Sequence, residues 1–245
     1  MGDYSSRVAL VGGADRGLGY EIVKELLRNG WNVYAGKFND EYSLVDDLKK
    51  EFPRVHPCVL NVCKVEDMKA VRDLIDAEFG KLDLLVSNAA FMGGEKTDVV
   101  GGEVPVDFDM LKFSFTTNSA AAPLLTETML PLLMKSDYKR LFYTSSEISS
   151  IKLMRRTGSM RYAMTKAALN ISVRMMFNTL RPQGFTFRLF QPGWMKRMMP
   201  DGTLAPGGSI DPAFSAREAV RQIQEDRIDE DRLVLVDFRG HELSV

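Results

Sequence analysis

The chain has 245 residues, a length that fits a single large α/β domain. Hydrophobic residues make up 45% and charged residues 27%, a balance that excludes a disordered or collagen-like chain. With 32 Lys and Arg against 33 Asp and Glu, the net charge of −1 gives no electrostatic indication of nucleic acid or an anionic membrane as a partner.

Short apolar runs alternate with segments of helical periodicity along the chain. The runs predict seven strands, at 7–13, 31–36, 55–62, 82–87, 140–145, 185–190 and 234–238. Apolar residues spaced three and four apart predict helices at 18–29, around 44–48, and at 65–79, 110–134 and 161–181. This alternation predicts an α/β fold of the Rossmann type, a doubly wound parallel seven-stranded sheet with helices on both faces.

No linker or internal repeat divides the chain, so we expect one domain over residues 1–245. The least regular segment, 195–214, is rich in Gly and Pro, and we expect it to be a lid over a substrate site. No stretch approaches the ~18–20 apolar residues of a membrane span, and no apolar leader opens the chain. We therefore expect a cytoplasmic protein with no membrane partner.

The two cysteines, Cys58 and Cys63, lie in a segment that is predicted to be extended. Extension would hold their Cα atoms farther apart than the ~4.4–6.8 Å that a disulfide requires. His56 could join them as a metal ligand, but a fourth ligand is lacking and the other histidine is the distant His241. We expect reduced thiols and no metal site.

A glycine-rich turn links the first strand to the first helix, Gly13-Ala14-Asp15-Arg16-Gly17-Leu18-Gly19. Its spacing differs from G-x-G-x-x-G, but glycines at this place also allow a tight turn and let a pyrophosphate approach a helix N-terminus. The position of the turn in the first βα unit favours dinucleotide binding. A tight turn without a ligand is the alternative.

The end of the second strand indicates which dinucleotide would bind. NAD enzymes usually place an acidic residue there for the ribose 2′-hydroxyl, but here the residue is Lys37, and Arg16 is a second cation nearby. Two cations favour a 2′-phosphate, hence NADP(H) over NAD(H). Solvated charges are the alternative, and Asp40 and Glu41 downstream leave NAD(H) open.

Tyr162 and Lys166 stand four residues apart in the predicted helix 161–181, so they share one face. A free tyrosine titrates near ~10. A neighbouring ammonium, joined by the cationic nicotinamide of an oxidised cofactor, favours the phenolate and lowers that pKa. Such a tyrosine can donate a proton to a ketone or take one from an alcohol.

The order of these motifs resembles the short-chain dehydrogenase/reductase superfamily over roughly Arg7 to Gly193. The glycine turn is followed by Ser87-Asn88-Ala89-Ala90, Asn118, Ser145-Ser146, Tyr162 with Lys166, and Pro192-Gly193. Short strings such as Lys166-Ala167-Ala168-Leu169-Asn170 are similar to the C-factor-like and carbonyl-reductase-like branch.

The resemblance implies a role for each matching residue. Tyr162 would be the general acid/base, Lys166 would lower its pKa and hold the nicotinamide ribose, Ser146 would position the substrate carbonyl, and Asn118 would hold a relay water. Asn88 would steady the central strand. The implied cofactor-binding residues are Gly13, Asp15, Arg16, Gly17, Leu18, Gly19, Lys37, Asn61, Val62, Asn88, Ala89, Ala90, Tyr162, Lys166, Pro192, Gly193 and Trp194.

Two departures from the family pattern bear on the site. Ser146 lies sixteen residues before Tyr162, about three more than is usual, whereas Ser149 has the usual gap and is a second candidate for the catalytic serine. The extra residues fall in the loop 148–161, where Arg155 and Arg156 could form a basic lip for an anionic substrate. A solvated loop or a subunit contact is the alternative.

The residues and the resemblance together predict a single NAD(P)-binding catalytic domain. We expect an NADP(H)-dependent oxidoreductase that reduces a ketone or aldehyde to an alcohol or runs the reverse reaction, working as a homodimer or homotetramer. A non-catalytic NADP(H)-sensing regulatory protein on the same fold is the alternative. A sugar-nucleotide epimerase or dehydratase is disfavoured, because that longer branch usually carries a C-terminal substrate domain.

Overall fold

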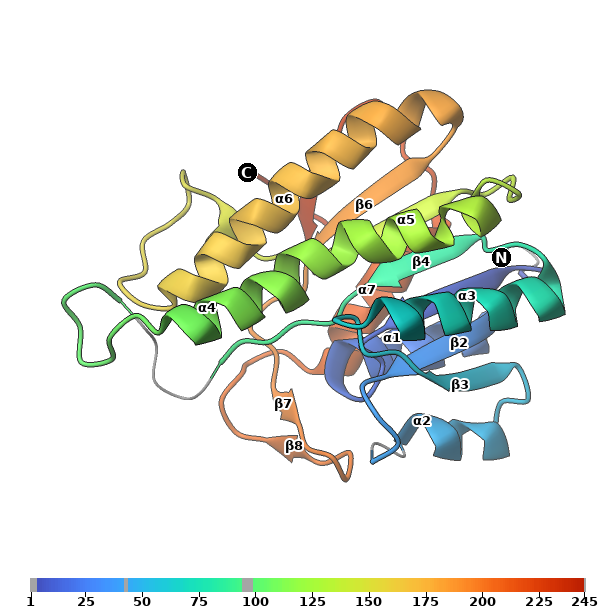
Figure 1. Cartoon of the computed structure of the whole chain (residues 1–245), viewed down its shortest axis with the longest axis horizontal. Coiled ribbons are helices and arrows are strands. Elements are labelled where there is room, and N and C mark those ends of the chain that lie inside the picture. The colour runs from blue at the N-terminus through green and yellow to red at the C-terminus, as the bar shows by residue number, and fades with distance from the viewer. Residues whose placement is uncertain (1–3, 42–43, 94–98, 245) are drawn as a thin grey trace.

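An eight-stranded sheet forms the centre of the molecule (Figure 1). The computed structural model describes residues 4–41, 44–93 and 99–244, and its strand order is β10-β9-β6-β5-β4-β1-β2-β3. The bounds are β1 (Val8–Gly12), β2 (Asn32–Lys37), β3 (Val55–Val59), β4 (Leu84–Ser87), β5 (Arg140–Thr144), β6 (Thr186–Gln191), β9 (Leu235–Asp237) and β10 (Glu242–Leu243).

The predicted doubly wound sheet of seven parallel strands is confirmed, and a short eighth strand extends it. β10 pairs antiparallel with β9 through a turn in which the Asp237 carboxylate accepts from the backbone N–H groups of Arg239 and His241. Two residues are too few for an apolar run to reveal such a strand. The strand order reverses between β1 and β4, and in open α/β sheets ligands bind outside the carboxyl ends of the strands at this switch point.

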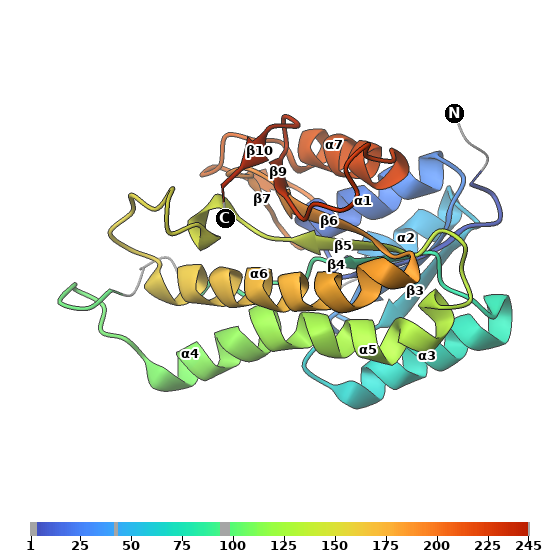
Figure 2. The same cartoon turned by 90° about the horizontal axis from the view of Figure 1, so that it is seen from above.

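Helices cover both faces of the sheet (Figure 2). On one face lie α1 (Gly17–Arg28) and α7 (Pro212–Gln224), and on the other lie α3 (Val65–Phe79), α4 (Phe108–Phe115), α5 (Ala121–Leu133) and α6 (Met160–Leu180). The short α2 (Leu44–Asp47) flanks β3 at one edge of the sheet (Figure 1). Each face has its own apolar core, since strand side chains alternate between the two sides.

Helix α7 was not predicted, although its sequence carries a start signal. The Asp211 carboxylate accepts from the Ala213 backbone N–H at 2.8 Å, and Pro212 occupies the first turn, where its missing N–H is harmless. Buried Ala219 and Ile223 then lie on its inner face. The segment 195–214, expected to be irregular, contains the start of α7 and a small hairpin of β7 (Arg197–Met198) and β8 (Leu204–Ala205).

The predicted helix 110–134 is interrupted by a π-helical turn at Thr116–Ala120, between α4 and α5. Before and within this turn, the hydroxyls of Ser114, Thr116 and Thr117 each donate to the carbonyl four residues earlier, a pattern that bends helices. Asn118 lies inside the turn. Among the helices of the described residues, none is long and apolar enough to cross a membrane.

Candidate active site at the carboxyl edge of the sheet

The glycine turn packs closely against the loop that follows β4. A Cβ atom on Gly13, whose φ is +70°, would lie 2.6 Å from the Ala89 Cα atom. A Cβ atom on Gly19 would lie 2.1 Å from the Gly13 carbonyl oxygen. Gly17 also has a positive φ, +61°, but its Cβ position faces open space. Two glycines therefore serve close packing, and the third lies where a ligand can approach the backbone.

The residues around this turn fit the pyrophosphate of a dinucleotide. The side chain of the N-cap residue Arg16 makes no capping hydrogen bond to α1, and the first turn of the helix holds no acidic residue. The Gly17 backbone N–H donates to the Met198 Sδ atom of the β7–β8 hairpin at 3.1 Å. A thioether is a weak acceptor, so the helix N-terminus is available to an anion that displaces this sulfur.

The end of β2 differs from the prediction of two cations available to a 2′-phosphate. The Lys37 side chain is only 8% exposed, and its ammonium pairs with the carboxylates of Asp46 at 2.7 Å and Asp40 at 3.3 Å. The segment after β2 folds back and supplies both carboxylates, which strand patterning could not show. Asp15 links the glycine turn to this place, because its Oδ1 atom accepts from the Phe38 N–H at 2.5 Å. Burial raises the pKa of Asp15. Arg16 is half-buried at the start of α1.

A chain of hydrogen bonds crosses the edge of the sheet from the glycine turn to α6. The Asn88 Nδ2 atom donates to the Gly13 carbonyl at 3.0 Å, and its Oδ1 atom accepts from the Thr144 hydroxyl at 3.0 Å. The Thr144 carbonyl in turn accepts from Lys166 Nζ at 2.7 Å. The predicted steadying residue Asn88 therefore joins the turn, β4, β5 and the Tyr–Lys helix.

Asn118 is tied to two elements by its side chain. The carboxamide donates to the Phe91 carbonyl at 2.8 Å and to the Thr165 hydroxyl at 3.1 Å, and it accepts from the Phe91 N–H at 2.6 Å. Its side chain is thus fully used in holding the segment after β4 against α6. The role of Asn118 in holding a water stays a prediction.

Tyr162 and Lys166 lie on one face of α6, with the Lys166 Nζ atom 5.7 Å from the centre of the Tyr162 ring. Burial raises the pKa of Tyr162 to about 12, and the charge of Arg156 lowers it only in part. Burial also lowers the pKa of Lys166 to about 8. The predicted lowering of the tyrosine pKa by this ammonium is therefore not seen in the protein alone, because desolvation outweighs the neighbouring charges.

The two candidate serines have different surroundings. Ser146 follows β5 and is half-buried, and its hydroxyl accepts one long hydrogen bond, 3.3 Å from the Ile148 N–H. Ser149 is buried, and its hydroxyl donates to the Ser146 carbonyl and accepts from the Asn170 side chain. The hydroxyl of Ser149 is thus engaged within the protein, whereas that of Ser146 has bonding capacity left.

The other predicted cofactor residues lie along the same edge. The Asn61 side chain accepts from the Cys63 N–H just after β3, and Val62 beside it is buried. Gly193 follows β6 with a φ of +83°, and Trp194 is 68% exposed. The structure places this set in the loops directly after the parallel strands or in the first turn of α1: Gly13, Gly17, Leu18, Gly19, Asn61, Val62, Asn88, Ala89, Ala90, Pro192, Gly193 and Trp194.

Three polar residues of the site were missed in the sequence: Thr144, Thr165 and Asn170. Thr144 contacts both Asn88 and Lys166, Thr165 accepts from Asn118, and Asn170 bonds to two serines. Asn170 carries a signal in retrospect, since it continues the spacing of four from Tyr162 and Lys166. The threonines carry none, because Thr144 contacts residues of other elements and Thr165 contacts Asn118 of the π-helical turn.

The two arginines of the loop 148–161 are engaged close to their own positions. The Arg156 guanidinium pairs with Glu147 at 2.8 Å, and that of Arg155 donates to the carbonyls of Lys152 and Met154. These contacts favour a charged loop that is held by its own bonds over the basic lip for an anionic substrate.

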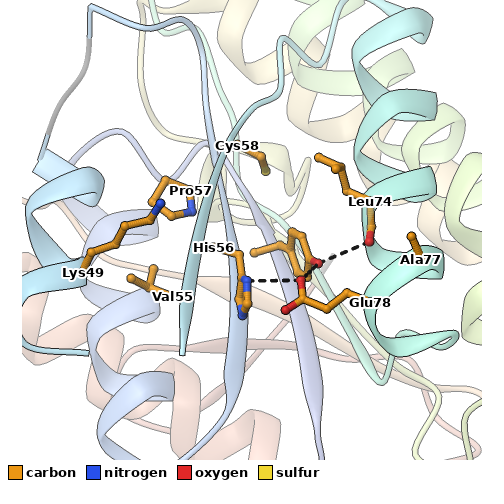
Figure 3. A pocket seen from close by; sticks show the side chains of 9 residues that line it. Lys49, Val55, His56, Pro57, Cys58, Leu74, Ala77 and Glu78 are labelled. Atoms are coloured by element: carbon orange, nitrogen blue, oxygen red, sulfur yellow. Dashed lines mark hydrogen bonds and ion pairs between the residues drawn. The ribbon is translucent and has the colours of Figure 1, made fainter. Parts of the chain in front are cut away.

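A second polar cluster lies away from this edge, where β3 meets α3 (Figure 3). Glu78 accepts from the Tyr34 hydroxyl at 2.5 Å and pairs with His56 Nδ1 at 3.3 Å, and the Tyr34 and His56 rings stack. Burial raises the pKa of the Cys58 thiol to about 12, and Cys63 instead lies beside the Thr117 hydroxyl. Both thiols are free, and in the described part of the chain no three His, Cys, Asp or Glu side chains are placed to hold a metal.

Comparisons with known proteins identify the family. A sequence model described as short chain dehydrogenase matches residues 7–203. The C-signal of Myxococcus xanthus is 35% identical over 133 residues, which cover 54% of this chain and 77% of that protein.

Solved structures share the fold. The carbonyl reductase Sniffer of D. melanogaster has a TM-score of 0.86 at 22% identity, with 98% of this chain and 99% of that chain covered. The NADPH-bound carbonyl reductase from chicken fatty liver has a TM-score of 0.84 at 24% identity, with the same shares covered. Because the family match spans most of the chain and the motifs stand in the expected order along the sheet edge, the chain belongs to the short-chain dehydrogenase family of oxidoreductases.

Proposed function

We propose that this protein is an NADP(H)-dependent oxidoreductase that reduces a ketone or aldehyde to an alcohol, or oxidises the alcohol in reverse. The observation that carries the proposal is the hydrogen-bonded path from the Gly13 carbonyl through Asn88 and Thr144 to Lys166. This path fixes the Tyr–Lys pair at the same sheet edge as the glycine turn, so one extended dinucleotide could reach both. The proposal concerns residues 1–245 as one catalytic domain, with 195–214 as its lid.

NADP(H) would supply the hydride when bound, and this chain's residues would orient it. The N–H groups at the start of α1 would hold the pyrophosphate, and Lys166 would hold the nicotinamide ribose. Arg16, together with Lys37 once its carboxylates are displaced, would face the 2′-phosphate. The chicken carbonyl reductase of the same fold is described with NADPH bound, which supports this choice of dinucleotide.

Tyr162 would donate its phenolic proton to the carbonyl oxygen as the alcohol forms. A group with a pKa of about 12 donates readily only if the phenolate becomes more stable in the complex. Lys166 supplies part of that stabilisation, because its pKa of about 8 leaves it largely charged at neutral pH. Ser146 would hydrogen-bond the carbonyl oxygen as negative charge develops. We assign this role to Ser146 over Ser149, whose hydroxyl is engaged at both ends.

A non-catalytic NADP(H)-sensing regulator on the same fold is the second candidate. One observation favours it, the 35% identity to a protein that is named C-signal. Asn118, Ser146, Tyr162 and Lys166 favour the enzyme, because sensing a dinucleotide would not require a proton donor beside it.

We further propose a homodimer or homotetramer formed through α5 and α6. The outer faces of these helices expose Leu124, Met134, Ile171 and Met175. A change of Met175 to Lys should shift the sedimentation coefficient to that of a monomer, whereas an unchanged value would exclude this surface. We also propose a reducing compartment such as the cytoplasm, supported by the two free thiols.

Fluorescence titration with NADPH and NADH tests the cofactor assignment. We expect tighter binding of NADPH, and weaker NADPH binding by the Arg16→Ala variant. The Asp46→Asn variant should bind NADPH more tightly, because it releases Lys37 from its closest carboxylate. Equal affinity for NADH and NADPH in all three proteins would refute the preference for the 2′-phosphate.

Turnover by the Tyr162→Phe variant tests the chemistry. With 1-phenyl-1,2-propanedione as the carbonyl probe, we expect a loss of at least ~10²-fold in kcat with an unchanged Kd for NADPH. Tyr20→Phe is a matched control, a half-buried tyrosine on α1 whose replacement should leave kcat unchanged. Full activity of Tyr162→Phe would remove the mechanism, and NADPH binding without turnover of a carbonyl panel by the unmodified protein would favour the regulator.

A further inference from the structure

Helix α6 carries a third polar residue in line with the tyrosine and the lysine. Tyr162, Lys166 and Asn170 are spaced by four residues, so all three lie on one face of the helix. That face meets the end of β5 and the short 3₁₀ turn at Glu147–Ser149 that follows it. Asn170 therefore lies one helical turn beyond Lys166, beside the segment that holds Ser146.

Both ends of the Asn170 carboxamide are used there. Its Oδ1 atom accepts from the Ser145 hydroxyl at 2.6 Å, and its Nδ2 atom donates to the Ser149 hydroxyl at 2.7 Å. The Ser149 hydroxyl then donates to the Ser146 carbonyl at 2.6 Å. Ser145 and Ser149 are 1% and 7% exposed, so water cannot readily replace these bonds.

The bonded residues Ser145 and Ser149 lie on either side of Ser146, the candidate catalytic serine. Among the described residues, the Ser146 hydroxyl has one long contact, from the Ile148 N–H, so the position of its oxygen depends on the backbone of the turn. Asn170 holds the Ser145 hydroxyl directly and acts on the Ser146 carbonyl through the Ser149 hydroxyl. These bonds add to two backbone hydrogen bonds, from the Ser145 N–H to the Phe190 carbonyl and from the Ser149 N–H to the Ser146 carbonyl.

We propose that Asn170 is a positioning residue that fixes Ser146 relative to Tyr162 and Lys166. A substrate carbonyl has to meet the serine hydroxyl and the tyrosine hydroxyl at once, and these groups come from different elements. Asn170 is on the same helix as Tyr162, so its two hydrogen bonds, together with the bond from Lys166 to the Thr144 carbonyl, hold the two elements at a fixed distance. The catalytic meaning of this role rests on the proposed carbonyl reduction.

Kinetics of the Asn170→Ala variant test the role. A displacement of about 1 Å in a positioned group can cost ~10²-fold in rate, so we expect kcat for 1-phenyl-1,2-propanedione to fall by about 10- to 100-fold. The Kd for NADPH should not change. Asn170→Asp keeps an acceptor for Ser145 but removes the donor to Ser149, so its loss should be smaller. Asn178→Ala, an exposed asparagine on the same helix, is the control and should keep full activity.

A double variant separates positioning from a general loss of structure. If Asn170 acts through Ser146, Asn170→Ala should cause no further loss of kcat in a Ser146→Ala background. Losses that multiply in the double variant would overturn the proposal.

Crystal structures of the unmodified protein and of Asn170→Ala give a test that needs no turnover. We expect the Ser146 turn to shift while Tyr162 and Lys166 stay in place, and an unmoved turn would overturn the inference. If the unmodified protein reduces no carbonyl compound, the proposed function fails while this comparison still decides what holds the turn.

Discussion

Replacing Asn88 with alanine would cut the connection between the glycine turn and the end of β5. The Asn88 side chain makes two hydrogen bonds, to the Gly13 carbonyl and from the Thr144 hydroxyl, both at 3.0 Å. Alanine removes both bonds and leaves two polar groups without their partner. Because Thr144 also accepts from Lys166, the change reaches the Tyr–Lys helix as well.

The size of the effect follows from these contacts. A buried hydrogen bond contributes about 1 kcal/mol net, and a polar group left unpaired costs ~1–3 kcal/mol. For two bonds whose groups keep some contact with water, we expect a loss of about 2–4 kcal/mol in the free energy of unfolding. In a chain of this size each kcal/mol lowers Tm by ~2–4 °C, so Tm should fall by roughly 4–16 °C.

Thermal unfolding and NADPH titration measured together test this reasoning. We expect Asn88→Ala to raise the Kd for NADPH by about tenfold, because the glycine turn is held less firmly. A tenfold change corresponds to ~1.4 kcal/mol of binding free energy. Asn32→Ala is a matched control, since its side chain also donates two hydrogen bonds, to the carbonyls of Ser5 and Arg7, but at the start of β2, away from the candidate site. That variant should lose stability and keep its Kd. An Asn88→Ala protein as stable as the unmodified one, with the same Kd, would refute the role of the path.

Three further predictions concern buried charge. In denaturant unfolding at pH 7, Arg188→Met should lower the free energy of unfolding by about 3–5 kcal/mol, because it leaves the Glu230 carboxylate without its partner. Adding Glu230→Gln should restore part of the loss. The surface variant Arg232→Met is the control and should cost under ~1 kcal/mol. Burial lowers the pKa of Lys166 to about 8, so above that pH the unfolded chain binds more protons than the folded protein. The stability of the unmodified protein relative to Lys166→Met should therefore rise between about pH 8 and 10.5. A difference in stability that does not change with pH would contradict the burial of the ammonium. Burial also lowers the pKa of His56 below 6.5. The stability of the unmodified protein relative to His56→Gln should therefore fall as the pH drops through that value. A relative stability that rises on acidification would show that the folded protein holds a protonated histidine instead.

Features that follow from patterns repeated along the chain could be predicted from the sequence. Apolar runs predicted all seven parallel strands, since a buried strand must be apolar on both faces. Helix α7 was not predicted, and its first residues fall in the Gly- and Pro-rich segment 195–214 that we expected to be a lid, although Asp211 and Pro212 mark a helix start. The π-helical turn around Asn118 was also missed, because the helical spacing of apolar residues continues through it.

Contacts and burial that depend on the tertiary structure could not be predicted from the sequence. Lys37 looked like an available cation, but its two carboxylate partners lie three and nine residues later, on a segment that folds back. The pKa of Tyr162 was expected to fall beside an ammonium, yet its value depends on how deeply the ring is buried, which no spacing reveals. Thr144 carries no motif of its own, and its contacts with Asn88 and Lys166 depend on the tertiary structure.

The Met198 sulfur accepts from the Gly17 amide and so would compete with a phosphate for the anion site that we propose at the start of α1. Any phosphate that binds there has to exchange with a group already attached to the protein, so its apparent affinity equals the intrinsic affinity multiplied by the fraction of molecules in which the amide is released. A thioether keeps that penalty small because it accepts hydrogen bonds weakly. A carboxylate at position 198 would make this penalty large. In the same geometry, the chain would then inhibit the binding of the phosphate.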